Sequence, residues 1–147
     1  MRVSARTRYG VRLIFCLALN YGKGPVFLKE IAGKEGISEK YLSQIIIPLR
    51  GVGLVNSIRG AHGGYMLGKD PVDITVKDIV KVLDKDFNFV EINEKNILSS
   101  RRTVNCINQL VWDKLEKSIS KTLEDISLKS IVDNYRDNEN NILMYNI

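Results

Sequence analysis

The chain has 147 residues, of which 44% are hydrophobic and 27% are charged, and its formal net charge is +5. These values are typical of one globular domain, or of a small domain with an appended arm, and they exclude a disordered or collagen-like chain. Residues 1–69 hold 11 basic and 3 acidic residues, whereas residues 70–147 hold 11 and 14. The basic N-terminal half is therefore predicted to face an anionic partner.

The first residues, MRVSARTRYGVRLIFCLALN, resemble a secretion signal in one respect, because arginines precede an apolar run. The run covers only residues 13–19 and no small-residue cleavage site follows it, so we expect an amphipathic helix instead. No apolar stretch approaches the roughly 18 residues of a membrane span. Cys16 and Cys106 do not make a disulfide framework, which favours a cytoplasmic protein without a membrane partner.

A first helix is predicted near the N-terminus. Apolar residues from Val3 to Leu19 recur at helical spacing, Ser4 or Thr7 is the candidate cap, and Gly22 follows the end of the helix. The arginines of this segment are expected on its exposed side.

Residues 28–49, LKEIAGKEGISEKYLSQIIIPL, divide into two short helices around Gly36-Ile37-Ser38. The glycine tolerates the positive φ of a tight turn, and the serine can cap the second helix. This spacing indicates a helix-turn-helix whose second helix reads DNA bases, although an ordinary helical hairpin would show the same pattern. Pro48 is expected to bend or end the second helix near Ile47, because proline removes a backbone hydrogen bond.

The stretches LVNSIR and YMLG then flank a loop rich in glycine, which predicts a β-hairpin directly after the helix-turn-helix. A basic hairpin at this place is a wing, and Arg59 near its tip is suited to a minor groove. The loop lacks the Lys-Ser or Lys-Thr of a P-loop, and His62 is the only histidine of the chain, so nucleotide and metal sites are disfavoured. A plain glycine-rich hairpin is the alternative.

The residues expected to contact double-stranded DNA therefore come from the first helix, the helix-turn-helix and the wing. They are Arg8, Ser38, Glu39, Lys40, Tyr41, Ser43, Gln44, Arg50, Arg59, Gly60, His62, Gly63 and Tyr65. One side chain can satisfy more than one base, so this set predicts a contact surface and not an operator sequence.

The second half of the chain predicts helices with another role. Residues 75–84 fit a short amphipathic helix, and the polar residues 85–105 are expected to form a long loop. Over residues 104–126 apolar side chains recur every three or four positions, which is more than a small domain covers. A second subunit would bury this stripe, and burial within one chain is the alternative. The expected dimerisation residues are Ile107, Val111, Leu115, Ile119 and Leu123, and residues 136–147 are expected to be a disordered or docked tail.

Three stretches carry a family resemblance: MRVSARTRYGVRLIFCLAL, ISEKYLSQIIIPLRGVGLVNSIRGAHGGYMLGKDP and CINQLVWDKLEKSI. Over about residues 1–133 the chain resembles the Rrf2 family of bacterial winged helix-turn-helix regulators. The resemblance implies a mainly α fold with a small β-hairpin. Residues 1–70 would form the DNA-binding domain, and residues 71–135 a helical linker and dimerisation region. It further implies a homodimeric transcription factor, mostly a repressor, on a pseudo-palindromic operator.

The family's iron–sulfur members carry three closely spaced cysteines before the long helix and a histidine ligand shortly after them. This chain has only Cys106, at the position of the last cysteine, and Gln109 where the histidine stands. A cluster needs about four ligands, so no cofactor is expected and an iron–sulfur cluster is the alternative. The chain resembles instead the cluster-free, CymR-type branch, which implies regulation of cysteine or sulfur metabolism and a partner such as cysteine synthase or another regulatory protein.

Two further hypotheses concern Cys106. Arg101 and Arg102 lie near it and would stabilise its thiolate, which makes it a candidate redox sensor, whereas a semi-buried structural cysteine is the alternative. A thiol enzyme with Cys106 as nucleophile is disfavoured, because the one histidine lies on the wing and no catalytic motif is evident. The chain is therefore not expected to be an enzyme. An adaptor that does not read DNA is disfavoured by the charge of the first half.

Overall fold

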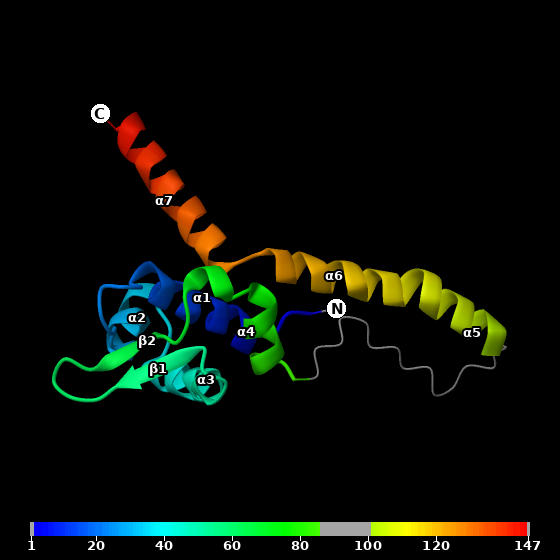
Figure 1. The fold of residues 1–147 in the computed structure, drawn as a ribbon, viewed down its shortest axis with the longest axis horizontal. Helices are drawn as coiled ribbons and strands as arrows, with labels where there is room; N and C mark the ends of the chain where they lie inside the picture. Colours follow the sequence, from blue (N-terminus) through cyan, green and yellow to red (C-terminus); the bar gives the residue numbers. More distant parts are fainter. Residues whose placement is uncertain (1, 86–100, 147) are drawn as a thin grey trace.

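The computed structural model describes residues 2–85 and 101–146 of the chain (Figure 1). The expected fold class is confirmed, since helices dominate and the two strands form one antiparallel hairpin. In chain order the elements are α1 (Ala5–Leu19), α2 (Leu28–Glu35), α3 (Glu39–Gly51), β1 (Val55–Ile58), β2 (Gly64–Leu67), the 3-10 turn η1 (Pro71–Asp73), α4 (Val76–Leu83), α5 (Arg101–Ile107), the π-helical segment η2 (Asn108–Trp112), α6 (Asp113–Asp125) and α7 (Leu128–Tyr145). In the two described ranges, no helix combines the length and apolar character needed to cross a bilayer.

Local capping explains where the N-terminal helices begin. The Ser4 hydroxyl accepts a hydrogen bond from the Thr7 backbone N–H at 3.1 Å, so the predicted cap of α1 is confirmed. Between α2 and α3, Gly36 adopts φ 65°, a left-handed conformation that glycine reaches without a Cβ clash. The Ser38 hydroxyl then accepts from the Tyr41 N–H at 3.4 Å and starts α3. The predicted helix-turn-helix is thus present at the expected turn.

The core forms around α1. Leu13, Ile14 and Leu17 on this helix are at most 1% exposed. They pack with buried side chains of α3, α4 and α7, such as Leu42 and Leu128, which are fully buried. Helix α1 therefore supports the helix-turn-helix on one side and the C-terminal helices on the other (Figure 1).

The hairpin joins this core through β2 and a short bridge. Val55 pairs with Leu67 and Ile58 with Gly64 in an antiparallel register. At the outer edge of β2, Tyr65 forms an isolated bridge with Val26, which lies in the connection between α1 and α2. The base of the hairpin is thereby held against the same segment that leads into the helix-turn-helix.

The long C-terminal helix is confirmed, and it begins at Arg101 rather than at residue 104. Helices α5 and α6 continue through η2 as one arm that extends away from the rest of the chain (Figure 1). At the near end of the arm, Lys77 on α4 pairs with Glu124 on α6 at 2.9 Å. Thr75 also bridges Ser127, so the arm is attached where α7 begins. Residues 86–100 of the expected loop lie outside the described residues, and residues 101–105 are helical.

Two further expectations differ from the structure. Pro48 was expected to bend or end α3 near Ile47, and the helix does not end there but includes Pro48 and continues to Gly51. Ile46 and Leu49 are buried on either side of the proline, so packing holds the helix together, while the carbonyl freed at Gln44 lies on an exposed residue.

The residues expected to form a disordered or docked tail continue α7 to Tyr145. The Ser127 hydroxyl caps this helix by accepting from the Ser130 N–H at 3.1 Å. Polar pairs one turn apart then extend it, such as Lys129 with Asp133 at 2.7 Å. The sequence pattern did not predict α7, because its outer part is polar and shows little apolar period.

Gly10 marks the closest approach of α1 and α4. A Cβ built on Gly10 would overlap Leu83 Cδ1, and Gly10 is buried. Gly33 on α2 is the matched case, because it is also helical but a Cβ there meets nothing within 4 Å. A side chain at position 10 would therefore force the buried Leu83 side chain out of its observed position between α1 and α4.

We expect the free energy of unfolding of Gly10→Ala to be roughly 1–3 kcal/mol lower than that of Gly33→Ala. Both substitutions raise helix propensity equally, but only the new methyl group at position 10 overpacks the core. Urea unfolding followed by circular dichroism measures this difference. Equal stability of the two variants would contradict the close approach.

Candidate nucleic-acid interface

The outer face of α3 carries the polar side chains that the sequence assigned to base reading. Lys40 and Gln44 are exposed, whereas Leu42 and Ile45 on the opposite face are at most 1% exposed. The Ser43 hydroxyl, also exposed, donates to the Glu39 backbone carbonyl at 2.9 Å. Lys40 and Gln44 are therefore the α3 side chains with the most freedom to reach a base edge.

Tyr41 differs from its neighbours on α3 because it is half-buried. Its ring meets the edge of Tyr9 on α1 at a centroid distance of 5.8 Å and an interplanar angle of 89°. The Arg12 guanidinium lies 5.8 Å from the Tyr9 centroid. These contacts fix the start of α3 relative to α1, so Tyr41 helps to set the orientation of α3.

The wing presents its basic residues at the tip of the hairpin. Arg59 and His62 are exposed, and Gly60 adopts φ 111° to make the turn. Gly63 is buried, and a Cβ there would overlap the Ile58 carbonyl oxygen. Tyr65 is half-buried and packs against the core. The expected wing thus divides into a free basic tip and an anchored base.

Helix α3 and the hairpin lie next to one another and contact each other through β1 (Figure 1). Arg8 on α1 and Arg50 at the end of α3 are exposed as well. In the part of the chain that the structure describes, no ion pair involves Arg8, Lys40, Arg50 or Arg59. Their charges are therefore available to phosphate groups.

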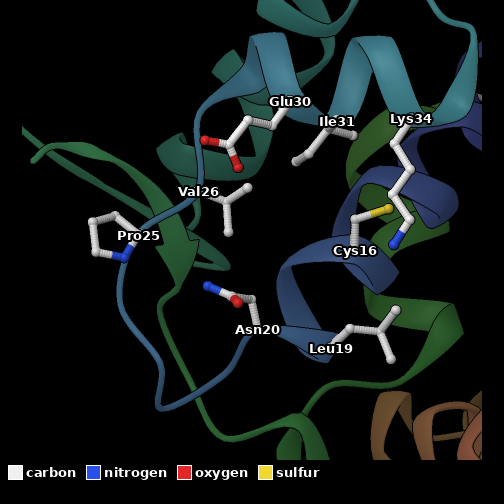
Figure 2. Close-up of a pocket in the computed structure, with 8 residues that line it drawn as sticks. All are labelled: Cys16, Leu19, Asn20, Pro25, Val26, Glu30, Ile31 and Lys34. Carbon is white, nitrogen blue, oxygen red and sulfur yellow. The ribbon is translucent and has the colours of Figure 1, made fainter.

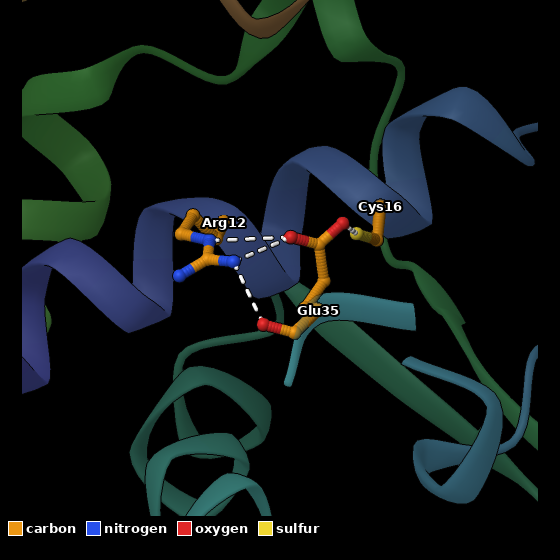
Figure 3. A network of polar contacts seen from close by, with 3 residues as sticks. All are labelled: Arg12, Cys16 and Glu35. Atoms are coloured by element: carbon orange, nitrogen blue, oxygen red, sulfur yellow. Dashed lines mark hydrogen bonds and ion pairs between the residues drawn. The ribbon is translucent and has the colours of Figure 1, made fainter. Parts of the chain in front are cut away.

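Arg12 has a different role, which the sequence did not predict. It joins Glu35 and Cys16 in a network between α1 and α2, as Figure 3 shows. The Arg12 guanidinium donates to the Glu35 carboxylate at 2.7 Å and to its backbone carbonyl at 2.9 Å. The Cys16 thiol donates to the same carboxylate at 3.6 Å. Arg12 and Cys16 are four residues apart on one helix, and this spacing is the one signal of the network in the sequence.

The network sets the chemistry of two groups. Burial, followed by the negative charge and hydrogen bond of Glu35, raises the pKa of Cys16 to about 11. The hydrogen bond from Arg12 is the main cause that lowers the pKa of Glu35. At neutral pH Cys16 is therefore a protonated, weakly nucleophilic thiol. Its side chain is half-buried and packs against the core.

The residues expected for dimerisation lie along the arm. Ile107, Val111 and Leu115 are exposed in the single chain, at 44%, 46% and 36%. Ile119 and Leu123, nearer the core, are half-buried. Cys106 is exposed on α5, one residue before this stripe.

The donor set does not fit an iron–sulfur cluster. Among the described residues, no three His, Cys, Asp or Glu side chains gather where they could hold a metal ion. The whole sequence contains two cysteines and one histidine. Cys16 is bonded to Glu35, Cys106 lies on the arm and His62 on the wing, so these donors belong to three separate places.

The Cys16 environment predicts its reactivity in a Cys106→Ser variant, where it is the only thiol. At pH 8 about one molecule in a thousand carries the thiolate, so alkylation by iodoacetamide should be slow and rise up to about pH 11. Glu35→Gln should move this profile to lower pH, because it removes the negative charge beside the sulfur. Glu30→Gln on the same helix is the control and should leave the profile unchanged. A midpoint near pH 9 in all three proteins would contradict the network.

The sequence is similar to that of known transcriptional regulators. A family model described as "Rrf2: Iron-dependent Transcriptional regulator" matches residues 3–134. The chain is 37% identical to the HTH-type transcriptional regulator CymR of Bacillus subtilis over 147 residues, which cover 100% of both chains. It is 34% identical to the HTH-type transcriptional regulator IscR of Klebsiella pneumoniae over 134 residues, covering 91% of this chain and 81% of that one.

Solved structures agree with the sequence comparison. The structure of CymR, the global cysteine regulator of B. subtilis, matches with a TM-score of 0.79 at 35% identity and covers 91% of this chain and 98% of that chain. The structure of IscR from T. potens matches with a TM-score of 0.73 at 41% identity, covering 92% and 88%. Because the family model spans most of the sequence and these relatives match along it, the chain belongs to the Rrf2 family of helix-turn-helix transcriptional regulators.

Proposed function

We propose that this regulator acts as a homodimer that binds a pseudo-palindromic operator and represses transcription. The observation that carries the proposal is the pairing of an exposed polar face on α3 with a free basic wing tip at Arg59. A helix of this kind fits a major groove, and an arginine on a hairpin fits an adjacent minor groove. Lys40 and Gln44 would reach base edges, while Arg8 and Arg50 would contact phosphates.

The proposed contact surface keeps the full set of residues derived from the sequence. Ser38 and Glu39 begin α3, and helix N-termini favour phosphate oxygens. Gly60 and Gly63 shape the turn that lets the wing backbone approach DNA. His62 at the tip can donate to a phosphate.

Dimerisation is proposed through the arm. Ile107, Val111 and Leu115 form an apolar stripe at helical spacing, and Leu110 beside them is 69% exposed. Contiguous exposed apolar surface on a soluble protein marks an interaction site, and a second copy presents the same stripe. The twofold axis would then place two α3 helices about 34–36 Å apart, one DNA turn. We assign residues 1–70 to DNA binding and residues 71–135 to linkage and dimerisation.

The regulated genes are proposed to belong to cysteine or sulfur metabolism, with no cluster bound and with cysteine synthase or another regulatory protein as partner. The support is the match with CymR along the full length of both chains, and the separation of the thiol and imidazole donors. We place the regulator in the cytoplasm, where its promoters are, and assign it no enzymatic activity.

Binding to the chain's own promoter fragment tests the proposal. The apparent affinity should fall steeply with salt, with a logarithmic slope that reflects about 6–10 phosphate contacts. A flat salt response, or equal affinity for an unrelated fragment, would overturn sequence-specific DNA binding.

We expect Arg59→Ala to weaken operator binding by about 1–3 kcal/mol, because residues 54–68 contain no other arginine or lysine that could replace Arg59 in a narrow minor groove. Fluorescence anisotropy at fixed salt measures the effect. Arg136→Ala on exposed α7 removes the same charge far from the wing and should bind as the wild type does. Superimposable isotherms for Arg59→Ala and wild type would remove Arg59 from the contact surface.

We expect Val111→Glu to be monomeric at micromolar concentration, because the substitution places a charge in the apolar stripe. Sedimentation velocity reads the assembly state directly. Gln109→Glu adds the same charge two positions earlier, on a different side of the helix, and should remain dimeric. A dimer in both variants would show that the arm is not the interface.

A further inference from the structure

A cavity of about 490 Å³ lies behind the helix-turn-helix, outside the DNA-reading surface (Figure 2). Its walls are the C-terminal half of α1, the connection that contains Val26, and one face of α2. Ile31, which is 3% exposed, contributes an apolar wall together with Val26. The volume falls within the range of about 300–1,000 Å³ that is usual for small-molecule sites.

Two opposite charges border this cavity without pairing. Glu30 and Lys34 are four residues apart on α2, in the order that favours an ion pair on a helix. Lys129 and Asp133 at the same spacing do pair, at 2.7 Å. Within the described residues Glu30 and Lys34 form no ion pair, and Figure 2 shows their side chains on different sides of the cavity, with Ile31 and Val26 between them.

Two neighbouring titratable groups, Glu35 and Cys16, are bonded to each other and also feel the charge of Lys34. The Glu35 carboxylate is held by Arg12 at 2.7 Å, and the Cys16 thiol that lines the cavity donates to Glu35. The raised pKa of Cys16, about 11, keeps the thiol neutral at pH 7. The cavity is therefore bordered by an exposed carboxylate at Glu30 and an exposed ammonium group at Lys34, and a zwitterion can pair with both, whereas a ligand with a single charge pairs with one.

The side chain of Asn20 adds a polar group at the same wall. Its amide nitrogen donates to the Gly24 carbonyl at 2.9 Å, which fixes the orientation of the side chain. The amide oxygen has no hydrogen-bond partner among the residues that the structure describes. It can therefore accept a hydrogen bond from a bound ammonium group.

The cavity is connected directly to the wing. The Val26 N–H donates to the Tyr65 carbonyl and the Tyr65 N–H donates to the Val26 carbonyl, both at 2.8 Å. A Cβ built on Gly64 would lie 2.6 Å from the Val26 oxygen, so the two backbones are in close contact. A displacement of Val26 is therefore passed to β2 at Tyr65, one residue pair from the turn of the hairpin.

We propose that this cavity binds a small free amino acid and that binding changes the operator affinity. The ligand's ammonium group would meet Glu30 and Asn20, its carboxylate would meet Lys34, and its side chain would lie on Ile31 and Val26. The effect on the operator rests on the proposed DNA-binding function, whereas amino-acid binding does not.

Isothermal titration of the full chain with L-valine and with L-serine tests the site. Saturable binding is expected, together with a loss of roughly tenfold or more in Glu30→Gln and in Lys34→Gln, because each leaves one charge of the zwitterion unpaired. Lys29→Gln, an exposed control on the same helix, should bind as the wild type does. Valinamide and N-acetylvaline carry one charge each and should bind more weakly than L-valine.

Three results would overturn the site: no saturable binding of either amino acid up to about 10 mM, equal binding of valinamide or N-acetylvaline, or wild-type affinity in both cavity variants. Operator binding with saturating amino acid tests the coupling, where a change of about fivefold or more is expected and an unchanged affinity would overturn it. Absence of operator binding both without and with the amino acid would overturn the proposed function and leave the titration result standing.

Discussion

The burial of one face of α1 is the interaction on which the rest of the structure depends. Leu13, Ile14 and Leu17 lose nearly all their exposure, and burial of each such side chain contributes about 1.5–3 kcal/mol. The helix contacts α3, α4, α7 and β2, so it joins the helix-turn-helix and the hairpin to the C-terminal part. Gly10 extends this role, because its missing side chain is what allows α4 to approach.

Because α1 supplies the packing, the surface of α3 and the wing is free for recognition. Leu42 and Ile45 hold α3 against the core, and the opposite side of the same helix needs no internal partner. The wing follows the same rule, since Tyr65 anchors its base and Arg59 at its tip pairs with no acidic group of the described chain. Charges that make no internal ion pair keep their full attraction for phosphate. The basic half of the sequence can therefore form a packed core and still attract DNA at its surface.

The elements that could be predicted from the sequence are those with local causes. Gly36 in a left-handed turn, Ser38 as a cap and the short strands around the wing each act within a few residues, and all were located correctly. Two features were not predicted, for different reasons. Helix α3 passes through Pro48 because flanking side chains are buried, which is a tertiary cause, whereas α7 is held by a local cap and by polar pairs one turn apart and has little apolar pattern in its outer half. The Arg12 network joins residues 19 and 23 positions apart, and no local pattern indicates such a contact.

The arm and α7 are both connected to α1, the arm by way of α4 and α7 by direct contact. Lys77 on α4 pairs with Glu124 at the end of α6, and Phe15 on α1 meets Tyr135 on α7 at a ring distance of 5.4 Å. In the proposed dimer the spacing of the two reading helices would therefore be set through α1, whose other side carries Cys16 and the wall of the amino-acid cavity. A ligand that moves α2 or Val26 relative to α1 would act on the proposed reading helices without loosening the proposed dimer contact, because the arm is held by α4. In these proposals the operator spacing depends on the arm and α4, whereas the ligand would displace α2 or the connection that contains Val26.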